Sequence, residues 1–175
     1  MPTPTLRTDR LSLTPYREAD EDDFVALFQD ERVACWMGDG VVPSEDADRA
    51  LFRRIFSKVY ATDLFDVWAV RKDAELVGHA EIKHTDEAGG HEVVYALAPA
   101  HWGHGLGREI ATAVLRHGFE TLGLEQVHAT VDARNEASLG LLDGLGFRRL
   151  RDVEEPDGGT TRHLALGRPS RVTAP

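Results

Sequence analysis

The chain has 175 residues, 42% of them hydrophobic and 29% charged, a composition typical of one folded globular domain and unlike that of a disordered segment. Its formal net charge of −10 argues against nucleic acid as a partner, because neutralising phosphates requires a basic surface. No apolar run approaches the ~20 residues of a membrane helix and the first residues do not form a signal peptide. The single cysteine, Cys35, fits a reducing cytoplasm.

Four segments are predicted before residue 60. Leu6 to Pro15 alternates apolar and polar residues and predicts a strand with an irregular start. Asp20 is a good N-cap for a helix that ends near Asp30. Glu31 to Pro43 predicts a loop or short turns, because glycines interrupt it. Ser44 to Val59 predicts a second helix that has a capping serine and an apolar face.

The rest of the chain predicts short strands around two helices. Turn-like sequences at 72–75 and 85–90 separate three strands, and Gly123 ends the first helix that follows. The predicted strands are 66–70, 76–83, 92–97, 126–131, 147–152 and 160–166, and the predicted helices run from the glycine-rich stretch to 120 and from 135 to 145. Residues 168–175 have no apolar pattern and predict a flexible tail.

A glycine-rich loop joins the strand at 92–97 to the helix that ends at 120. Trp102-Gly103-His104-Gly105-Leu106-Gly107 places glycines on alternate positions directly before the helix. Such glycines let consecutive amide N–H groups form one concavity at the positive end of the helix dipole, so an anion is expected there. The spacing matches neither the nucleoside-triphosphate loop nor the dinucleotide fingerprint. Two interpretations remain: the loop binds a phosphate through backbone groups alone, or the glycines only make a tight turn.

A proline follows the strand that leads into this loop. Pro99 cannot donate to a ladder, so pairing of the strand with a neighbour should fail near Ala98. Backbone groups freed there can bind a ligand that carries amides. Coenzyme A has both amides and a pyrophosphate, and so would satisfy the strand and the loop together.

These residues resemble the acyl-CoA-binding core of the Gcn5-related N-acetyltransferase (GNAT) superfamily, whose signature is R/Q-x-x-G-x-G/A. The matching positions are Trp102, Gly105 and Gly107. Trp102 stands where the signature has Arg or Gln. The sequence WGHGLG is nevertheless similar to the variant of the RimJ/RimL-like branch of ribosomal-protein N-terminal acetyltransferases. The resemblance extends to Leu6–Phe28 and to Asn135-Glu136-Ala137-Ser138 followed by Leu145-Gly146-Phe147, and so covers most of the chain.

The resemblance implies an α+β domain over residues 1–167 with a mixed, mostly antiparallel sheet of about seven strands flanked by about four helices. It implies an acetyl-CoA-dependent N-acetyltransferase that acts on a primary amine, either a protein N-terminus or a small molecule. The partners expected are acetyl-CoA and the amine, without nucleic acid, membrane or metal; a homodimer is an option.

Acyl transfer to an amine needs a base, an oxyanion donor and a proton for the departing thiolate. We expect the oxyanion donor at the strand end, Leu97-Ala98. Glu92 is the first candidate for the base, since its place on this strand resembles that of the general-base glutamate in histone-acetylating relatives. Glu81 on the preceding strand is the alternative. A solvent-facing glutamate is the simpler reading of Glu92.

Asn135 and Ser138 lie three residues apart at the start of a helix and so share one side of it. In the family pattern both approach the pantetheine arm, which makes Ser138 the candidate proton donor and Asn135 an amide partner; ordinary helix capping by Asn135 is compatible with this. Tyr95 is a second possible acid. The predicted cofactor-binding residues are Leu97, Ala98, Trp102, Gly103, His104, Gly105, Leu106, Gly107, Arg108, Asn135 and Ser138, with Glu92, Ser138 and Asn135 as the catalytic set.

Two other functions stay open at this stage. A non-catalytic acyl-CoA-binding module would keep the loop without the chemistry, and would be favoured if Glu92 and Glu81 both point away from the cofactor sulfur. An unrelated phosphate-binding scaffold would bind adenosine diphosphate and not CoA. His101 and His104 are too few for a metal site, and Cys35 has no local nucleophile motif.

Overall fold

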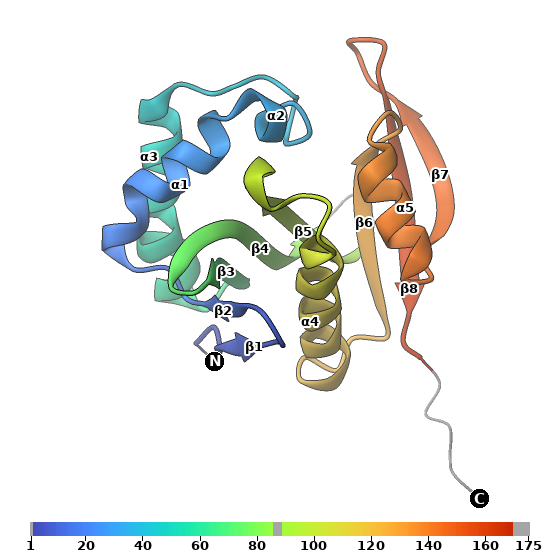
Figure 1. Cartoon of the computed structure of the whole chain (residues 1–175). Coiled ribbons are helices and arrows are strands. Elements are labelled where there is room, and N and C mark those ends of the chain that lie inside the picture. Colours follow the sequence, from blue (N-terminus) through green and yellow to red (C-terminus); the bar gives the residue numbers. More distant parts are fainter. Residues whose placement is uncertain (1, 86–88, 170–175) are drawn as a thin grey trace, which may run out of the picture.

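The computed structural model describes residues 2–85 and 89–169, which form one twisted sheet with helices on both faces (Figure 1). The strand order is β1-β2-β3-β4-β5-β6-β8-β7, and β5 and β6 are the parallel pair among otherwise antiparallel neighbours. The strands are β1 (Leu6–Arg7), β2 (Ser12–Thr14), β3 (Asp66–Lys72), β4 (Glu75–Thr85), β5 (Gly90–Leu97), β6 (Gln126–Asp132), β7 (Arg148–Glu154) and β8 (Thr160–Gly167). The predicted α+β class is confirmed, with eight strands in place of about seven.

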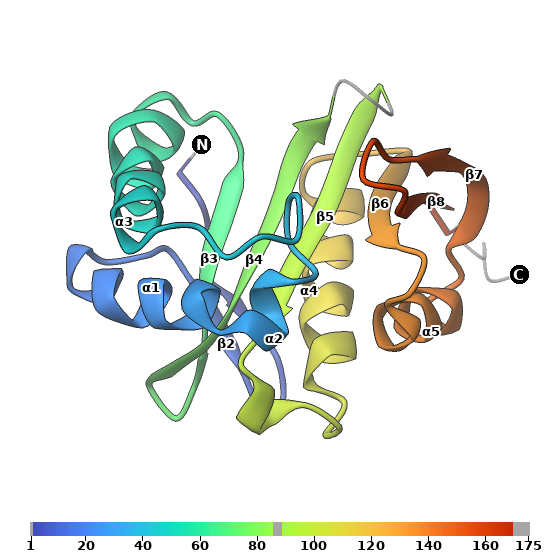
Figure 2. The same ribbon diagram turned by 90° about the horizontal axis from the view of Figure 1, so that it is seen from above.

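Five α-helices flank the sheet in the described residues. Figures 1 and 2 show α1 and α3 on one face of β3–β5 and α4 on the opposite face, between β5 and β6. The helices are α1 (Glu21–Gln29), α2 (Glu31–Ala34), α3 (Glu45–Arg54), α4 (Leu106–Glu120) and α5 (Glu136–Gly144). Short 3-10 turns lie at Glu18–Asp20, Tyr60–Thr62 and Pro99–His101. None of these helices is long and apolar enough to cross a membrane.

Three predicted elements change in the N-terminal third. The strand predicted from Leu6 to Pro15 is two short strands around a turn, in which the backbone N–H of Thr8 bonds Leu11 O at 3.0 Å. α2 lies inside the segment predicted as loop or turns; Asp30 caps it by accepting a hydrogen bond from Arg32 N. The predicted helix over 44–59 is α-helical only to Arg54 and continues as a π-helix over Ile55–Val59.

Of the two predicted capping residues, Ser44 makes its cap hydrogen bond and Asp20 does not. Ser44 accepts a hydrogen bond from Ala47 N and caps α3 as predicted. Asp20 occupies the N-cap position of α1, but its carboxylate makes no cap bond; it binds Arg17 N at 2.7 Å and pairs with the buried Arg71 at 2.5 Å. An unpaired charge on the buried Arg71 would cost more free energy than an uncapped helix end, because the helix end can bind water.

The core has two main parts, one on each face of the sheet, and a small third cluster of Leu27, Val33 and Ala96. The apolar side of α4, including the fully buried Ile110 and Val114, packs against Trp68 and Ile82. On the opposite face, under α1 and α3, Tyr16 packs edge to face against Phe24 and Phe52, and the two phenylalanine rings are tilted against each other. Burial of these large rings anchors both helices to β3 and β4.

The parallel pairing of β5 and β6 is short and positions the site. Only His91 with Val127 and Glu92 with His128 are paired, and beyond them the two strands diverge. We call this divergence the fork. Because β5 still pairs with β4 up to Leu97 and β6 pairs with β8, the fork leaves one edge of each strand without a sheet partner. The two strands diverge after Glu92, five residues before Ala98, where Pro99 predicted that pairing of the strand would fail.

The C-terminal end stays against the domain as far as it is described. Arg168 donates to Phe119 O, its backbone N–H bonds Glu125 O, and its side chain pairs with Glu125 at 3.0 Å. Residues 170–175 lie outside the described part, so the division into a domain over 1–167 and a tail stays a prediction. The centre of the predicted turn at 85–90 also lies outside it.

Candidate acyl-CoA site

A cavity of about 1240 Å³ fills the fork. The diverging strands, the loop before α4 and the start of α5 form its inner wall, and the α2–α3 connection and the β7–β8 turn form its outer wall. The predicted residues that line it are Glu92, Leu97, Trp102, Gly103, Gly105, Leu106, Gly107, Arg108, Asn135 and Ser138. The tertiary structure therefore gathers predicted residues from three separate segments around one space.

The loop before α4 has the backbone that its glycines favour. Gly103 and Gly105 both have φ of +76°, in the left-handed region, and Gly105 is the N-cap of α4. A Cβ at Gly103 would meet nothing within 4 Å, so the loop is open on that side. Bare N–H groups at a helix N-terminus in an open loop suit a phosphate.

Trp102 has a structural role that explains its place in the first slot of the signature. Its indole Nε1 donates to Leu97 O at 2.7 Å, which ties the loop to the last residue of β5. The ring is 43% exposed and lines the cavity. Tryptophan therefore fixes the distance between the strand edge and the glycine loop with one hydrogen bond.

Of the two backbone donors predicted at the end of β5, only Leu97 faces the fork. Ala98 N donates to Val77 O at 2.8 Å, and Ala98 does not line the cavity, so the prediction of Ala98 as an oxyanion donor is wrong. Hydrogen-bonding direction alternates along an antiparallel strand, so Tyr95 N and Leu97 N point away from β4 into the fork. Leu97 keeps its predicted place, and the divergence of β6 supplies the opening that proline does not.

Glu92 spans the fork at its closed end. Its Oε1 accepts hydrogen bonds from the backbone N–H of Thr130 at 3.2 Å and from the Thr130 hydroxyl. Thr130 lies two residues beyond the last paired position of β6, so the carboxylate binds a donor that β5 no longer reaches. Within the described residues Oε2 makes no hydrogen bond. One oxygen thus holds the strands together and the other stays available to the cavity that Glu92 lines.

Glu81, the alternative base, belongs to a different network. Its carboxylate binds His79 Nε2 at 3.1 Å and Lys83 Nζ at 3.2 Å, and Tyr16 hydroxyl lies 2.8 Å from His79 Nδ1. Burial disfavours its charged form, but the contacts with His79 and Lys83 outweigh burial and lower the pKa of Glu81 to about 2. Glu81 does not line the cavity, and so acidic a carboxyl is a weak base.

The two predicted acids form a pair. Tyr95 hydroxyl lies 2.9 Å from Ser138 Oγ, which joins β5 to α5. Burial raises the pKa of Tyr95 above its usual value, against the effect of the Ser138 hydrogen bond, so the phenol keeps its proton at neutral pH. Asn135 Oδ1 accepts from Ser138 N at 3.1 Å and caps α5. The capping role is present, and it orients the helix start that carries Ser138.

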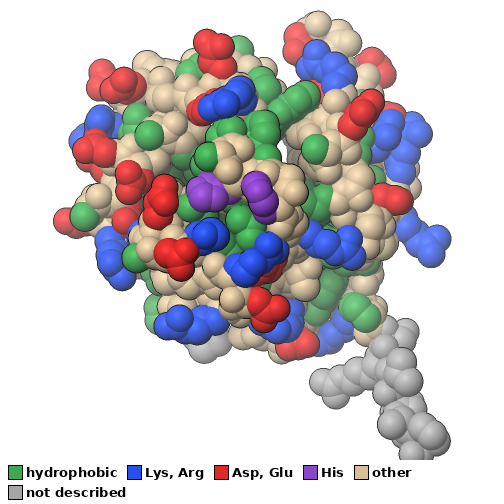
Figure 3. Space-filling model, viewed as in Figure 1, with side chains coloured by type: hydrophobic (Ala, Val, Ile, Leu, Met, Phe, Trp, Pro, Cys, Tyr) green, Lys and Arg blue, Asp and Glu red, His purple; other side chains and the backbone are tan. Residues whose placement is uncertain are grey.

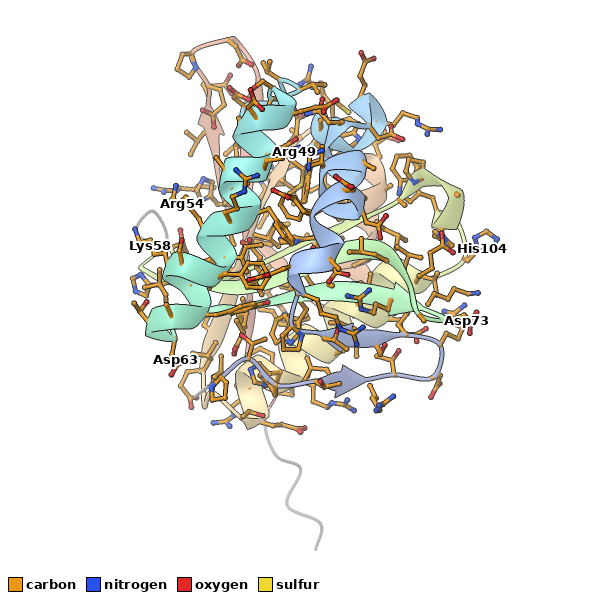
Figure 4. All side chains as sticks on the ribbon, turned by 90° about the vertical axis from the view of Figure 1, so that its left-hand side faces the viewer. Arg49, Arg54, Lys58, Asp63, Asp73 and His104 are labelled. Atoms are coloured by element: carbon orange, nitrogen blue, oxygen red, sulfur yellow. The ribbon has the colours of Figure 1, made fainter. Side chains whose placement is uncertain are left out.

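Two of the predicted cofactor-binding residues, His104 and Arg108, make contacts that stabilise the fold. His104 does not line this cavity; its carbonyl accepts a hydrogen bond from Arg10, and the side chain lies on the surface (Figure 4). Arg108 lines the cavity while its Nη2 donates to Gly144 O at 2.8 Å. The prediction that His104 side chain helps bind the cofactor therefore has no support in this geometry. The described residues contain no group of three or more His, Cys, Asp or Glu that could hold a metal.

Sequence reasoning missed several residues at this site. Thr130 carries no motif, and its link to Glu92 depends on the register of β5 against β6. Trp36, Asp39 and Val41 line the cavity from a segment predicted only as a loop, and Glu155 and Asp157 reach it from the β7–β8 turn. No spacing in the sequence identified these positions.

Comparison with known proteins agrees with this site. Residues 10–148 match the family described as acetyltransferase (GNAT) domain. The chain is 31% identical to YoaA of Bacillus subtilis, an uncharacterized N-acetyltransferase. The match extends over 153 residues and covers 83% of this chain and 84% of that relative. The fold and site define an acyl-CoA-dependent acyltransferase, and the chain belongs to the GNAT family of acetyltransferases. The predicted family and enzyme class are confirmed.

Solved structures share the fold at low sequence identity. RimL, described as a ribosomal alpha-N-protein acetyltransferase in complex with coenzyme A, has a TM-score of 0.80 at 12% identity, covering 94% of this chain and 98% of that one. RimJ of Mycobacterium smegmatis, in complex with a CoA disulfide, has a TM-score of 0.75 at 20% identity, covering 94% and 86%. The two proteins named by the resemblance thus have this architecture.

Proposed function

We propose that this enzyme moves the acetyl group of acetyl-CoA directly to a primary amine, in a ternary complex, with Glu92 as the base and Ser138 as the proton donor. One observation carries the proposal. Glu92, the Tyr95–Ser138 pair and the glycine loop come from three different elements and all line a single cavity. No covalent enzyme intermediate is needed, because the amine attacks the thioester itself.

The protonated amine gives one proton to Glu92, directly or through a water. The neutral nitrogen then forms a bond to the acetyl carbon and releases its second proton to water. The thioester oxygen becomes an oxyanion, for which the N–H groups of β5 that face the fork are donors; one such backbone donor contributes ~3–4 kcal/mol in other enzymes. The carbon–sulfur bond then breaks, and the thiolate takes a proton from Ser138. Tyr95 restores the proton of Ser138 and regains its own from water, to which Glu92 also returns the proton that it took.

The outer wall favours a cationic acceptor. Asp39, Glu155 and Asp157 line it, and Trp36 and Val41 add exposed apolar surface. The acceptor must lose a proton before it attacks, from a pKa of about 8 for a protein N-terminus or about 10 for an alkyl amine. Nearby carboxylates draw the protonated form to Glu92. A protein N-terminus, as in the RimJ/RimL-like branch, and a small-molecule amine both fit this proposal, as does a cytoplasmic location; a homodimer stays an option.

We expect Ser138→Ala to lower kcat by about tenfold to a hundredfold, because the thiolate loses its proton donor. The KM for acetyl-CoA should change little, since α5 keeps its Asn135 cap, which binds only the backbone of residue 138. Tyr95→Phe should give a smaller loss of kcat. Stopped-flow measurement of thiol release at saturating substrates checks both; an unchanged kcat in Ser138→Ala would remove Ser138 from the mechanism.

The proposal is tested by thiol release from acetyl-CoA over a panel of amines. The panel contains peptides with free N-termini, N-terminally blocked peptides with free lysines, polyamines and amino acids. Turnover with one class identifies the acceptor. CoA binding without turnover on any amine would favour the non-catalytic module, although Glu92 lining the cavity argues against it. Absence of CoA binding would overturn the cofactor itself.

A further inference from the structure

One lysine lines the acyl-CoA cavity. The chain has three lysines, Lys58, Lys72 and Lys83, all within the described residues, and only Lys83 is among the residues that line the cavity. Figure 3 shows this face of the molecule hollowed between the side that carries α1–α3 and the side that carries α5 and β7. The proposed acceptor is a primary amine, and a lysine side chain ends in one. The cavity therefore contains an amine that belongs to the protein itself.

The sheet places Lys83 beside the proposed base. Lys83 on β4 and Glu92 on β5 are opposite residues of an antiparallel pair. Side chains at opposite positions project from the same face of the sheet, with Cβ atoms about 4.5–5.5 Å apart. Glu92 keeps one carboxylate oxygen available to the cavity, because only Oε1 binds Thr130. Lys83 can therefore give a proton to Glu92 directly or through a water, as the proposed acceptor does.

The ammonium of Lys83 is directed from the base toward the proposed oxyanion donors. Its Nζ lies 3.2 Å from Glu81 Oε2, and Glu81 is opposite Val94, two residues nearer the open end of the fork than Glu92. Val94 adjoins Tyr95, whose backbone N–H faces the fork. The nitrogen thus lies on the side of the base where the thioester is expected.

The ion pair with Glu81 does not fix the lysine in place. The side chain of Lys83 is 38% exposed, and ion pairs that solvent reaches contribute little to stability. Glu81 keeps its contact with His79 at 3.1 Å when the ammonium leaves. Because the amine ends a flexible four-carbon chain, it can move into the cavity while β4 stays paired in the sheet.

We propose that Lys83 is a self-acetylation site: when acetyl-CoA is bound and no other amine occupies the cavity, the acetyl group is transferred to Lys83 Nζ. The inference rests on the proposed function, since it uses the same cofactor and the same base. The Lys83 ammonium gives one proton to Glu92, and the neutral nitrogen bonds to the acetyl carbon and releases its second proton to water. The carbon–sulfur bond breaks, and the thiolate takes a proton from Ser138 and leaves as CoA.

Self-acetylation changes the cavity and competes with the acceptor. Lys83 meets the acetyl group without the entropy cost of binding a second molecule, so the transfer needs only the cofactor. The product is a neutral amide that carries an added acetyl group into the acceptor space. An external amine and Lys83 compete for one acetyl group, so an amine that is turned over should slow the acetylation of Lys83.

The test incubates the full chain with acetyl-CoA that carries an isotope in the acetyl group and locates the isotope by peptide mass spectrometry. Lys72 is an internal control for reaction without catalysis. Its side chain is 40% exposed against 38% for Lys83, and it too pairs with one acid, Asp73 at 3.1 Å. Figure 4 shows Asp73 on the outside of the molecule, at the turn between β3 and β4. Spontaneous acetylation should modify the two lysines alike, whereas catalysis should modify Lys83 about a hundredfold faster, the effect of one general base.

Three variants separate catalysis from simple exposure. Glu92→Gln should slow the acetylation of Lys83 about a hundredfold and leave that of Lys72 unchanged. Lys83→Arg keeps a positive charge next to Glu81, and its total incorporation of acetyl groups should fall to the spontaneous level. Lys72→Arg is the matched control and should incorporate nearly as much as the wild type. The rate per chain should not depend on protein concentration, because each chain acetylates itself.

The outcomes distinguish this inference from the proposed function. Equal modification of Lys83 and Lys72, or a rate at Lys83 that Glu92→Gln leaves unchanged, would overturn self-acetylation; turnover of an amine from the panel would then leave the proposed function intact. A rate per chain that rises with protein concentration would also overturn it, because the transfer would occur between chains. Modification of Lys83 that requires Glu92 would support it even if no panel amine is turned over. If a variant does not fold, the ratio of the two lysines in the wild type decides.

Discussion

Glu92→Gln should lower kcat by about a hundredfold to ten-thousandfold, the range for loss of a general base. Glutamine keeps an oxygen that can accept the hydrogen bonds from Thr130 N and the Thr130 hydroxyl, so the link between β5 and β6 should be kept. It cannot take a proton from the amine. The KM for acetyl-CoA should therefore be nearly unchanged.

The matched control is Glu81→Gln on the neighbouring strand. Glu81 is held by His79 and Lys83 outside the cavity, so we expect its replacement to alter stability and to leave kcat within a few-fold. Steady-state kinetics from pH 5 to 9, with thermal unfolding of each variant, checks both expectations. A Glu92→Gln enzyme with normal kcat would reduce Glu92 to a structural link between β5 and β6.

Gly105→Ala should weaken CoA binding by tenfold or more. The φ of +76° at this N-cap costs a residue with a Cβ about 1–2 kcal/mol, and relief of that strain rotates the amides of the loop. Space is not the cause, because the nearest atom to the new Cβ is Arg10 Nη2 at an ordinary 3.6 Å. The effect is therefore purely conformational, and it should appear in CoA affinity more than in overall unfolding.

Gly140→Ala is the matched control for this substitution. Gly140 lies inside α5, has no atom within 4 Å of an added Cβ and has no positive φ. Alanine there should stabilise the helix by about 0.5–1 kcal/mol and leave CoA binding unchanged. Calorimetry with CoA and thermal unfolding of both variants compares them directly. Wild-type affinity in Gly105→Ala would show that the loop amides do not hold the cofactor.

The sequence by itself determined the features that depend on near neighbours in the chain. The glycines at 103 and 105 predict left-handed backbone before a helix, and both have it. Asn135 lies at the start of a predicted helix and caps it through Ser138 N. These features follow from local sterics and hydrogen bonding, which a spacing of a few residues encodes. The family resemblance depends on the same short stretches.

Only the tertiary structure decided which groups face the cavity. Whether Ala98 N is free depends on Val77 in another strand, and the contact of Glu92 with Thr130 crosses 38 positions of sequence. The Tyr95–Ser138 pair and the link between Arg10 and Glu109 likewise join distant segments. Strand register and the point where two strands diverge result from packing of the whole sheet against α4. No local pattern records them, because the same strand sequence can pair with more than one neighbour.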